Sequence, residues 1–119
     1  MPRVADYTII ADGWVADSET NTVNFDVPAN IDPNSRCILG FMLKVHNVNE
    51  MTLKIFINDT EVWNWHTSGH SNLPIRFFQE VIPAGLVTPG ANSFRFKVNT
   101  DDFESTMFSD IVLWWQANI

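Results

Sequence analysis

A strictly alternating segment in the second half of the chain constrains the fold more than any other feature. Pro89-Gly90 is a strong turn signal, and apolar and polar side chains alternate in the residues that follow it. Phe94, Phe96 and Val98 fall on one side of an extended chain, and the polar residues between them fall on the other. This is the pattern of a half-buried antiparallel strand, so the segment predicts an all-β fold.

The rest of the chain repeats this pattern between turn-rich segments, and no window shows a sustained apolar stripe of helical period. The segments predicted to be strands are residues 4–11, 22–27, 36–46, 52–58, 61–66, 75–82, 92–98 and 105–116. About eight short strands separated by turns indicate a two-sheet antiparallel β-sandwich, most simply a jelly roll. We expect one domain over residues 1–119, with a closed barrel as the alternative fold.

Composition limits the partners of the chain. The 119 residues carry a formal net charge of −7, which repels phosphate groups, so we predict neither a nucleic-acid partner nor a membrane partner. No apolar run has the length of a transmembrane helix or resembles a signal peptide, so we expect a soluble protein of unknown compartment. Cys37 is the only cysteine and borders an apolar run, which predicts a small buried hydrophobe and no intrachain disulfide.

Two stretches are similar to a known architecture. The first is Phe56-Ile-Asn-Asp-Thr-Glu-Val-Trp63, and the second is the Pro-Gly-x-Asn turn and strand of residues 86–98 with the closing apolar strand of residues 109–116. They resemble the jelly-roll β-sandwich of carbohydrate-binding modules and galactose-binding-like domains. The resemblance covers about the second half of the chain and concerns architecture. It implies a non-catalytic, lectin-like carbohydrate-binding module, and such modules often hold a structural calcium ion.

An aromatic pair is the first candidate ligand site. Trp63 and Trp65 lie two residues apart on a predicted strand and share a face, with Asn64 and His66 on the other face and His70 in the following loop. In one interpretation the indoles stack on the apolar faces of sugar rings, and the amide and imidazole groups contact hydroxyls. In the other, both indoles belong to the core and Asn64 and His66 form the exposed face.

The last predicted strand carries a second candidate, Trp114. The alternation puts Met107, Ile111, Leu113 and Trp115 on a core face and assigns Phe108, Asp110, Val112, Trp114 and Gln116 to the opposite face. Trp114 is therefore expected either to contact a ligand or a second subunit, or to be covered by a neighbouring segment.

The metal-site signals are weak. Asp101 and Asp102 belong to an acidic loop and Asp110 interrupts an apolar strand, so these three are the calcium candidates, although the spacing of an EF-hand is absent. We interpret the loop as a solvated acidic segment. His66 and His70 are four residues apart, but Ser68-Gly69 makes a loop between them, and we interpret them as polar loop histidines. We predict no other cofactor.

Catalytic motifs are missing: the sequence has no Gly-x-Ser-x-Gly elbow, no glycine-rich phosphate loop and no His-Glu-x-x-His. We therefore predict that the protein is not an enzyme, and we rank a small hydrolase last. The function that we favour is carbohydrate binding. The alternative is a structural or assembly subunit, such as a homo-oligomer, that uses the faces of its sandwich for protein contacts.

Overall fold

The computed structural model describes residues 3–12, 15–16, 20–48, 51–67, 71–100 and 106–118. Its strands are β1 (Arg3–Ala11), β2 (Val15–Ala16), β3 (Thr20–Val27), β4 (Cys37–Val48), β5 (Met51–Ile57), β6 (Thr60–Thr67), β7 (Ser71–Ile82), β8 (Gly90–Thr100) and β9 (Thr106–Asn118). The described residues contain no helix, and so none that could cross a membrane. The all-β prediction is confirmed, and the two-residue strand β2 is the one strand that the sequence pattern did not predict.

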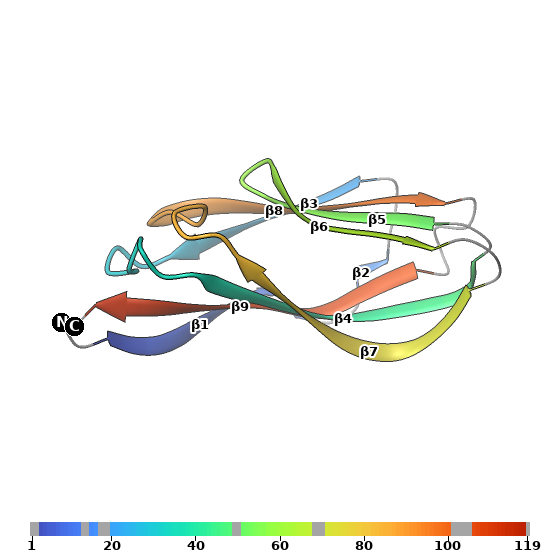
Figure 1. Cartoon of the computed structure of the whole chain (residues 1–119), viewed down its shortest axis with the longest axis horizontal. Coiled ribbons are helices and arrows are strands. Elements are labelled where there is room, and N and C mark those ends of the chain that lie inside the picture. The colour runs from blue at the N-terminus through green and yellow to red at the C-terminus, as the bar shows by residue number, and fades with distance from the viewer. Residues whose placement is uncertain are drawn as a thin grey trace.

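The strands form two antiparallel sheets that stack as separate layers (Figure 1). One sheet has the order β1-β9-β4-β7, with β2 also paired to β9, and the other has the order β3-β8-β5-β6. Successive long strands cross from one sheet to the other at every step except β5 to β6, which form a hairpin, and such crossings are typical of a jelly roll. The predicted sandwich is therefore confirmed in place of the closed barrel.

The core lies between the two sheets and follows the period of two in the sequence. On β8, Phe94 and Phe96 are fully buried, whereas Arg95 between them lies outside and its guanidinium sits 4.0 Å from the Phe56 ring centroid. The Phe96 ring meets Phe108 from the other sheet at a centroid distance of 4.4 Å. The other fully buried large side chains are Leu39, Phe41, Leu43, Leu53, Ile55, Ile57, Ile82, Phe108 and Ile111.

One assignment to a strand face was wrong. Phe108 was expected on the outer face of the last strand, but it is fully buried. The pairing of β9 with β4 shifts between Val112 and Ser109, where β9 contains one residue more than β4. Asp110 takes a left-handed backbone conformation there, with φ of 49°. This β-bulge reverses the alternation, so Phe108 points to the side opposite to the one predicted from the residues after the bulge. The side chain of Met107, predicted on the core face, lies outside the described part of the structure.

A pair of amide side chains, one buried and one half-buried, connects the two stretches that carry the resemblance. Asn58, in the β5–β6 turn with φ of 49°, donates its Nδ2 to the Asn92 Oδ1 (2.8 Å) and to the Leu86 carbonyl (2.9 Å). Its Oδ1 accepts the backbone N–H of Ser93 at 2.8 Å. Asn92 is buried and donates to the Thr88 carbonyl at 2.8 Å. Every polar side-chain atom of this pair has a partner, so the network holds the β5–β6 turn against the loop before β8.

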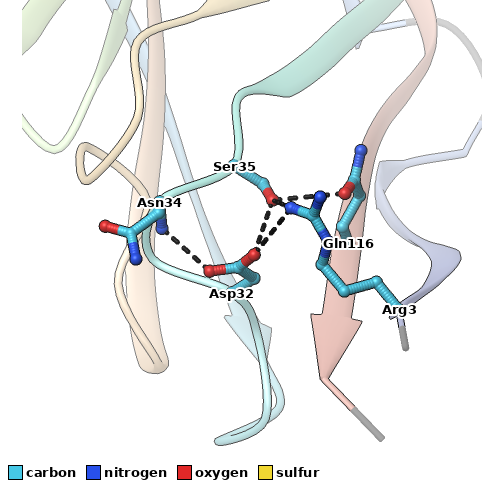
Figure 2. Close-up of polar contacts among 5 residues, drawn as sticks. All are labelled: Arg3, Asp32, Asn34, Ser35 and Gln116. Atoms are coloured by element: carbon cyan, nitrogen blue, oxygen red, sulfur yellow. Dashed lines mark hydrogen bonds and ion pairs between the residues drawn. The ribbon is translucent and has the colours of Figure 1, made fainter. Parts of the chain in front are cut away.

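A second polar cluster lies at the end of the sheet where β1 begins and β9 ends (Figure 2). Arg3 on β1 donates Nη1 to the Asp32 Oδ2 and to the Ser35 Oγ, each at 2.8 Å. The Ser35 Oγ also lies 3.2 Å from the Oε1 of Gln116 on β9. The backbone N–H of Asn34, then the Ser35 hydroxyl and Arg3, hold the pKa of Asp32 below its usual value, against an opposing effect of desolvation.

Candidate functional site

The predicted aromatic pair lies mostly inside the sandwich. Trp63 and Trp65 are partly buried and pack against the core. The Trp63 ring meets Phe41 edge to face at 5.2 Å and Phe78 at 5.9 Å, and Trp65 meets Phe78 at 6.1 Å. Phe41 belongs to β4 and Phe78 to β7, so the two indoles fill the space between the sheets. This arrangement favours the interpretation in which the pair stabilises the fold.

The polar residues predicted beside that pair lie on the other side of β6. Asn64 and His66 are exposed, and the His66 Nδ1 lies 2.8 Å from the Thr52 hydroxyl of β5. His70 lies outside the described residues. Asn64 and His66 are thus separated by the strand from the two indoles, because successive side chains on a strand point to opposite faces.

The calcium candidates are not brought together in the described part of the chain. Asp101 and Asp102 lie outside the described residues. Asp110 is exposed in the bulge, and one of its carboxylate oxygens accepts a hydrogen bond from the Ser109 hydroxyl at 2.5 Å. Within the described residues no three His, Cys, Asp or Glu side chains are grouped to hold a metal ion. A structural calcium ion therefore stays a prediction from the resemblance.

Trp114 lies on an exposed apolar surface, which we call the outer face. It is the side of the β1-β9-β4-β7 sheet that points away from the core. The register aligns Tyr7, Trp114, Ile38 and Val81 as successive partners across the four strands. Tyr7 and Val81 at the two ends of this row are 57% and 56% exposed. Six of the seven exposed large hydrophobic residues of the described chain belong to this face: Tyr7, Ile9, Ile38, Ile75, Phe77 and Val81.

Gly40 in the centre of the face lets two aromatic rings lie over the backbone of β4. Phe77 and Trp114 meet edge to face above it, with centroids 6.2 Å apart and planes at 84°. A Cβ atom on Gly40 would lie 2.4 Å from the Phe77 Cζ and 2.5 Å from the Trp114 Cζ3. Ordinary carbon contacts are about 3.5–4.0 Å, so only glycine accommodates the rings in this position. The two rings form an angular, half-exposed aromatic corner.

Uncharged polar groups lie at the edges of the outer face. Gln79 is the partner of Gly40 on β7, and Gln116 follows Trp114 on the same side of β9. Both are exposed. Lys44 lies at one end of the face on β4, and the Arg3 guanidinium at the other end is paired with Asp32. Apart from Asp110 in the bulge, no Asp or Glu occupies an outward position on these strands among the side chains that the structure describes.

The sequence contained a signal for this surface. Residues 37–43 are all apolar, and β4 therefore presents apolar side chains on both of its sides. A two-layer sandwich buries only one side of each sheet. An apolar run on an inner strand of such a sandwich therefore implies that the other side is an exposed apolar face. The alternation along the last strand predicted Trp114 on this side, whereas Tyr7, Ile38 and Phe77 were not predicted to belong to it.

Comparisons with known proteins identify the architecture. No protein-family model matches the sequence, and no curated protein matches it. Among solved structures, a segment of dimeric latent PorU from Porphyromonas gingivalis superposes with a TM-score of 0.65 at 7% identity; the match covers 98% of this chain and 13% of PorU. A family 35 carbohydrate-binding module from an environmental isolate has a TM-score of 0.58 at 13% identity over 88% of this chain and 74% of that module.

The xylan-binding module CBM15 has a TM-score of 0.54 at 13% identity, with 96% of this chain and 97% of that module covered. At these identities the similarity establishes a shared fold. The chain is therefore a β-sandwich that resembles carbohydrate-binding modules, as its two motif stretches predicted.

Proposed function

We propose that this protein is a non-catalytic carbohydrate-binding module whose ligand lies on the outer face. The observation that carries the proposal is the row of exposed apolar side chains around Trp114 and Phe77. Monomeric proteins rarely expose contiguous apolar patches of this kind without using them for binding. Sugar rings present apolar C–H faces that stack on indole and phenol rings, and nearby amides hydrogen-bond to their hydroxyls.

Tyr7, Phe77 and Trp114 are the proposed stacking residues, and Gln79 and Gln116 are the proposed hydroxyl contacts. The shared architecture with carbohydrate-binding modules supports the choice of ligand class. Of the residues singled out in the sequence, Trp114 keeps its proposed role.

A weaker version of the proposal keeps the other sheet as the site. There, Asn64, His66 and His70 would contact a polar ligand, while Trp63 and Trp65 would act through stability. The exposure of Asn64 and His66 supports this version, but no exposed aromatic side chain accompanies them among the described residues of β6.

The test is a binding screen with matched variants. Wild-type protein is run through affinity gels that contain a panel of polysaccharides, and tryptophan fluorescence is recorded on titration with soluble glycans. Trp114→Ala should weaken binding by about tenfold or more, equivalent to about 1.4 kcal/mol. Its melting temperature should fall by only a few degrees, because loss of the ring contact with Phe77 costs about 0.5–1.5 kcal/mol. Asn64→Ala is the control on the opposite sheet and should bind like wild type. Trp65→Ala should lower the melting temperature, since its ring packs against the core.

Two outcomes would contradict the proposal: silence of the wild type across the panel, or full binding by Trp114→Ala. If Asn64→Ala lost binding and Trp114→Ala kept it, the binding site would lie on the other sheet.

Self-association is the alternative function, because an exposed apolar face also suits contact with a second copy. Light scattering across a concentration series separates the two. A monomer at high concentration removes the homo-oligomer version. A dimer that Trp114→Ala dissociates would assign the outer face to assembly instead of carbohydrate.

A further inference from the structure

The charges around the outer face restrict the kind of glycan that it can take. Within strands β1, β9, β4 and β7, Lys44 at one end is the one outward-pointing basic side chain that is not paired with an acid among the described residues, because Arg3 is held by Asp32. Asp110, in the bulge of β9, adds a negative charge to the outer face, and the formal net charge of the whole chain is −7. Acidic sugars need Arg or Lys side chains, or a metal ion bridged by carboxylates, to balance their charge. The strands of this face supply one such unpaired side chain, Lys44 at the end of the face, and their described residues hold no group of carboxylates for a metal ion.

The hydrogen-bonding groups on the face have the opposite character. Gln79 and Gln116 each carry a donor and an acceptor in one side chain, and the Tyr7 hydroxyl can also do both. Figure 2 shows the Gln116 Oε1 directed at Ser35 and its amide nitrogen directed away from the polar cluster. Such groups match sugar hydroxyls, which also donate and accept, and they give no advantage to a carboxylate.

The shape of the face restricts the ligand further. The row from Tyr7 to Val81 crosses four strands, and three steps of about 4.8 Å make it roughly 14 Å long, which one sugar ring would not fill. The Phe77 and Trp114 planes stand at 84° to each other, so the aromatic surface is angular. A flat crystalline polysaccharide would contact one ring and miss the other. A single polysaccharide chain, in contrast, can lie in the corner between the two rings.

We infer that the ligand of the outer face is a single uncharged glycan chain of several sugar units, bound by ring stacking and neutral hydrogen bonds without a bridging metal ion. This inference rests on the proposed function and names its ligand class. The bound chain runs across the strands along the row from Tyr7 to Val81, with one sugar in the aromatic corner above Gly40.

The experiment compares defined probes on the full chain. Soluble xylan, mixed-linkage β-glucan and galactomannan are the neutral probes, polygalacturonate is the acidic probe, and crystalline cellulose powder is the flat probe. Affinity for a neutral probe should change less than about twofold on addition of EDTA, or on raising the salt to about 1 M, where the screening length is about 3 Å. Oligosaccharides of that probe should bind more tightly with length and then reach a plateau.

Protein variants test whether the bound glycan lies along the row from Tyr7 to Val81. Tyr7→Ala should remove the gain in affinity that the longest oligosaccharides show, while affinity for the shortest binding oligosaccharide stays close to wild type. Phe77→Ala should weaken all lengths equally, because the corner is common to them. Val4→Ser is the matched control, because Val4 is exposed on β1 of the same sheet without belonging to the outer face, and it should change affinity less than about twofold.

The failures of the two proposals can be told apart. Binding through Trp114 that is selective for polygalacturonate, is abolished by EDTA, or is confined to crystalline cellulose overturns this inference and leaves the proposed function standing. Absence of binding to every probe by wild type overturns both. A dimer that Trp114→Ala dissociates also overturns both, since the occupant is then a second copy of the chain.

Discussion

Replacement of Gly40 by alanine should move two aromatic rings and leave the sandwich folded. The new Cβ atom would lie 2.4 Å from the Phe77 Cζ and 2.5 Å from the Trp114 Cζ3. Relief to an ordinary carbon contact requires each ring to shift by about 1 Å. Both atoms are at the far ends of side chains on the outer face, so the rings can swing toward solvent. The backbone of β4 is not required to move.

The energetic cost is small because two effects oppose each other. Loss of the edge-to-face contact between Phe77 and Trp114 costs about 0.5–1.5 kcal/mol. Alanine recovers roughly 0.5–1 kcal/mol relative to glycine in a strand, because the unfolded chain has less conformational freedom to lose. We therefore expect a free energy of unfolding within about 1 kcal/mol of wild type, together with a changed aromatic corner.

Three measurements follow this change. Urea unfolding gives the free energy, and near-ultraviolet circular dichroism reports the altered ring pair. The five indole N–H signals in an NMR spectrum show whether the Trp114 signal, assigned with Trp114→Phe, shifts more than the other four. If a glycan binds in the corner, the affinity of Gly40→Ala for it should fall by several fold.

Gly90→Ala is the matched control. Gly90 has open space around it but a φ of +87°, so alanine there is strained without touching a ring. It should lose about 1–2 kcal/mol of stability and keep the Trp114 signal unchanged. A loss of more than about 3 kcal/mol in Gly40→Ala, with all five indole signals moved, would refute the argument, because the collision would then be absorbed by the strand instead of the two side chains.

Three further predictions concern stability and reactivity. Phe96→Ala should lower the free energy of urea unfolding by about 3–5 kcal/mol, whereas Arg95→Ala loses only its cation–π contact, about 0.5–1 kcal/mol; equal losses would mean that the strand faces are misassigned. Because the folded pKa of Asp32 is lowered, its stabilising contribution is present above the unfolded pKa and is lost as the pH falls through the folded value. Urea midpoints should therefore decline less steeply on acidification in Asp32→Asn than in wild type, and identical slopes would contradict this. Burial raises the pKa of Cys37 to about 11, so iodoacetamide should modify it slowly in native protein and readily in urea; fast native labelling would show that the thiol is accessible.

The strands were predictable because alternation is a direct consequence of a half-buried sheet. On β8 the alternation predicted that Phe94 and Phe96 are buried and that Arg95 points away from the core, and the structure confirms this. The alternation predicted the wrong face for Phe108, because the bulge at Asp110 inserts one residue that the local sequence pattern does not indicate. Bulges depend on pairing with a distant strand, which a single sequence does not display.

The candidate site was predictable only in part, for a different reason. Trp114 could be placed on the outward side of its strand, but its neighbours Tyr7 and Phe77 lie far away in the sequence. The cross-strand register that brings them together is a property of the topology. For Trp63 and Trp65 the pattern showed a shared side without showing which side was buried, because both sides of β6 carry large or polar groups that fit either environment.

The pairing of β1 with β9 sets how the fold would respond to mechanical load. Strands β1 and β9 are antiparallel partners, and Arg3 pairs with Asn118 at the same end of the sheet. A force that pulls these ends apart acts along the direction of the inter-strand hydrogen bonds and opens them one after another from that end, like a zipper. The Arg3–Asp32–Ser35–Gln116 cluster lies at the end where separation begins. Its hydrogen bonds must therefore break before β1 and β9 can separate.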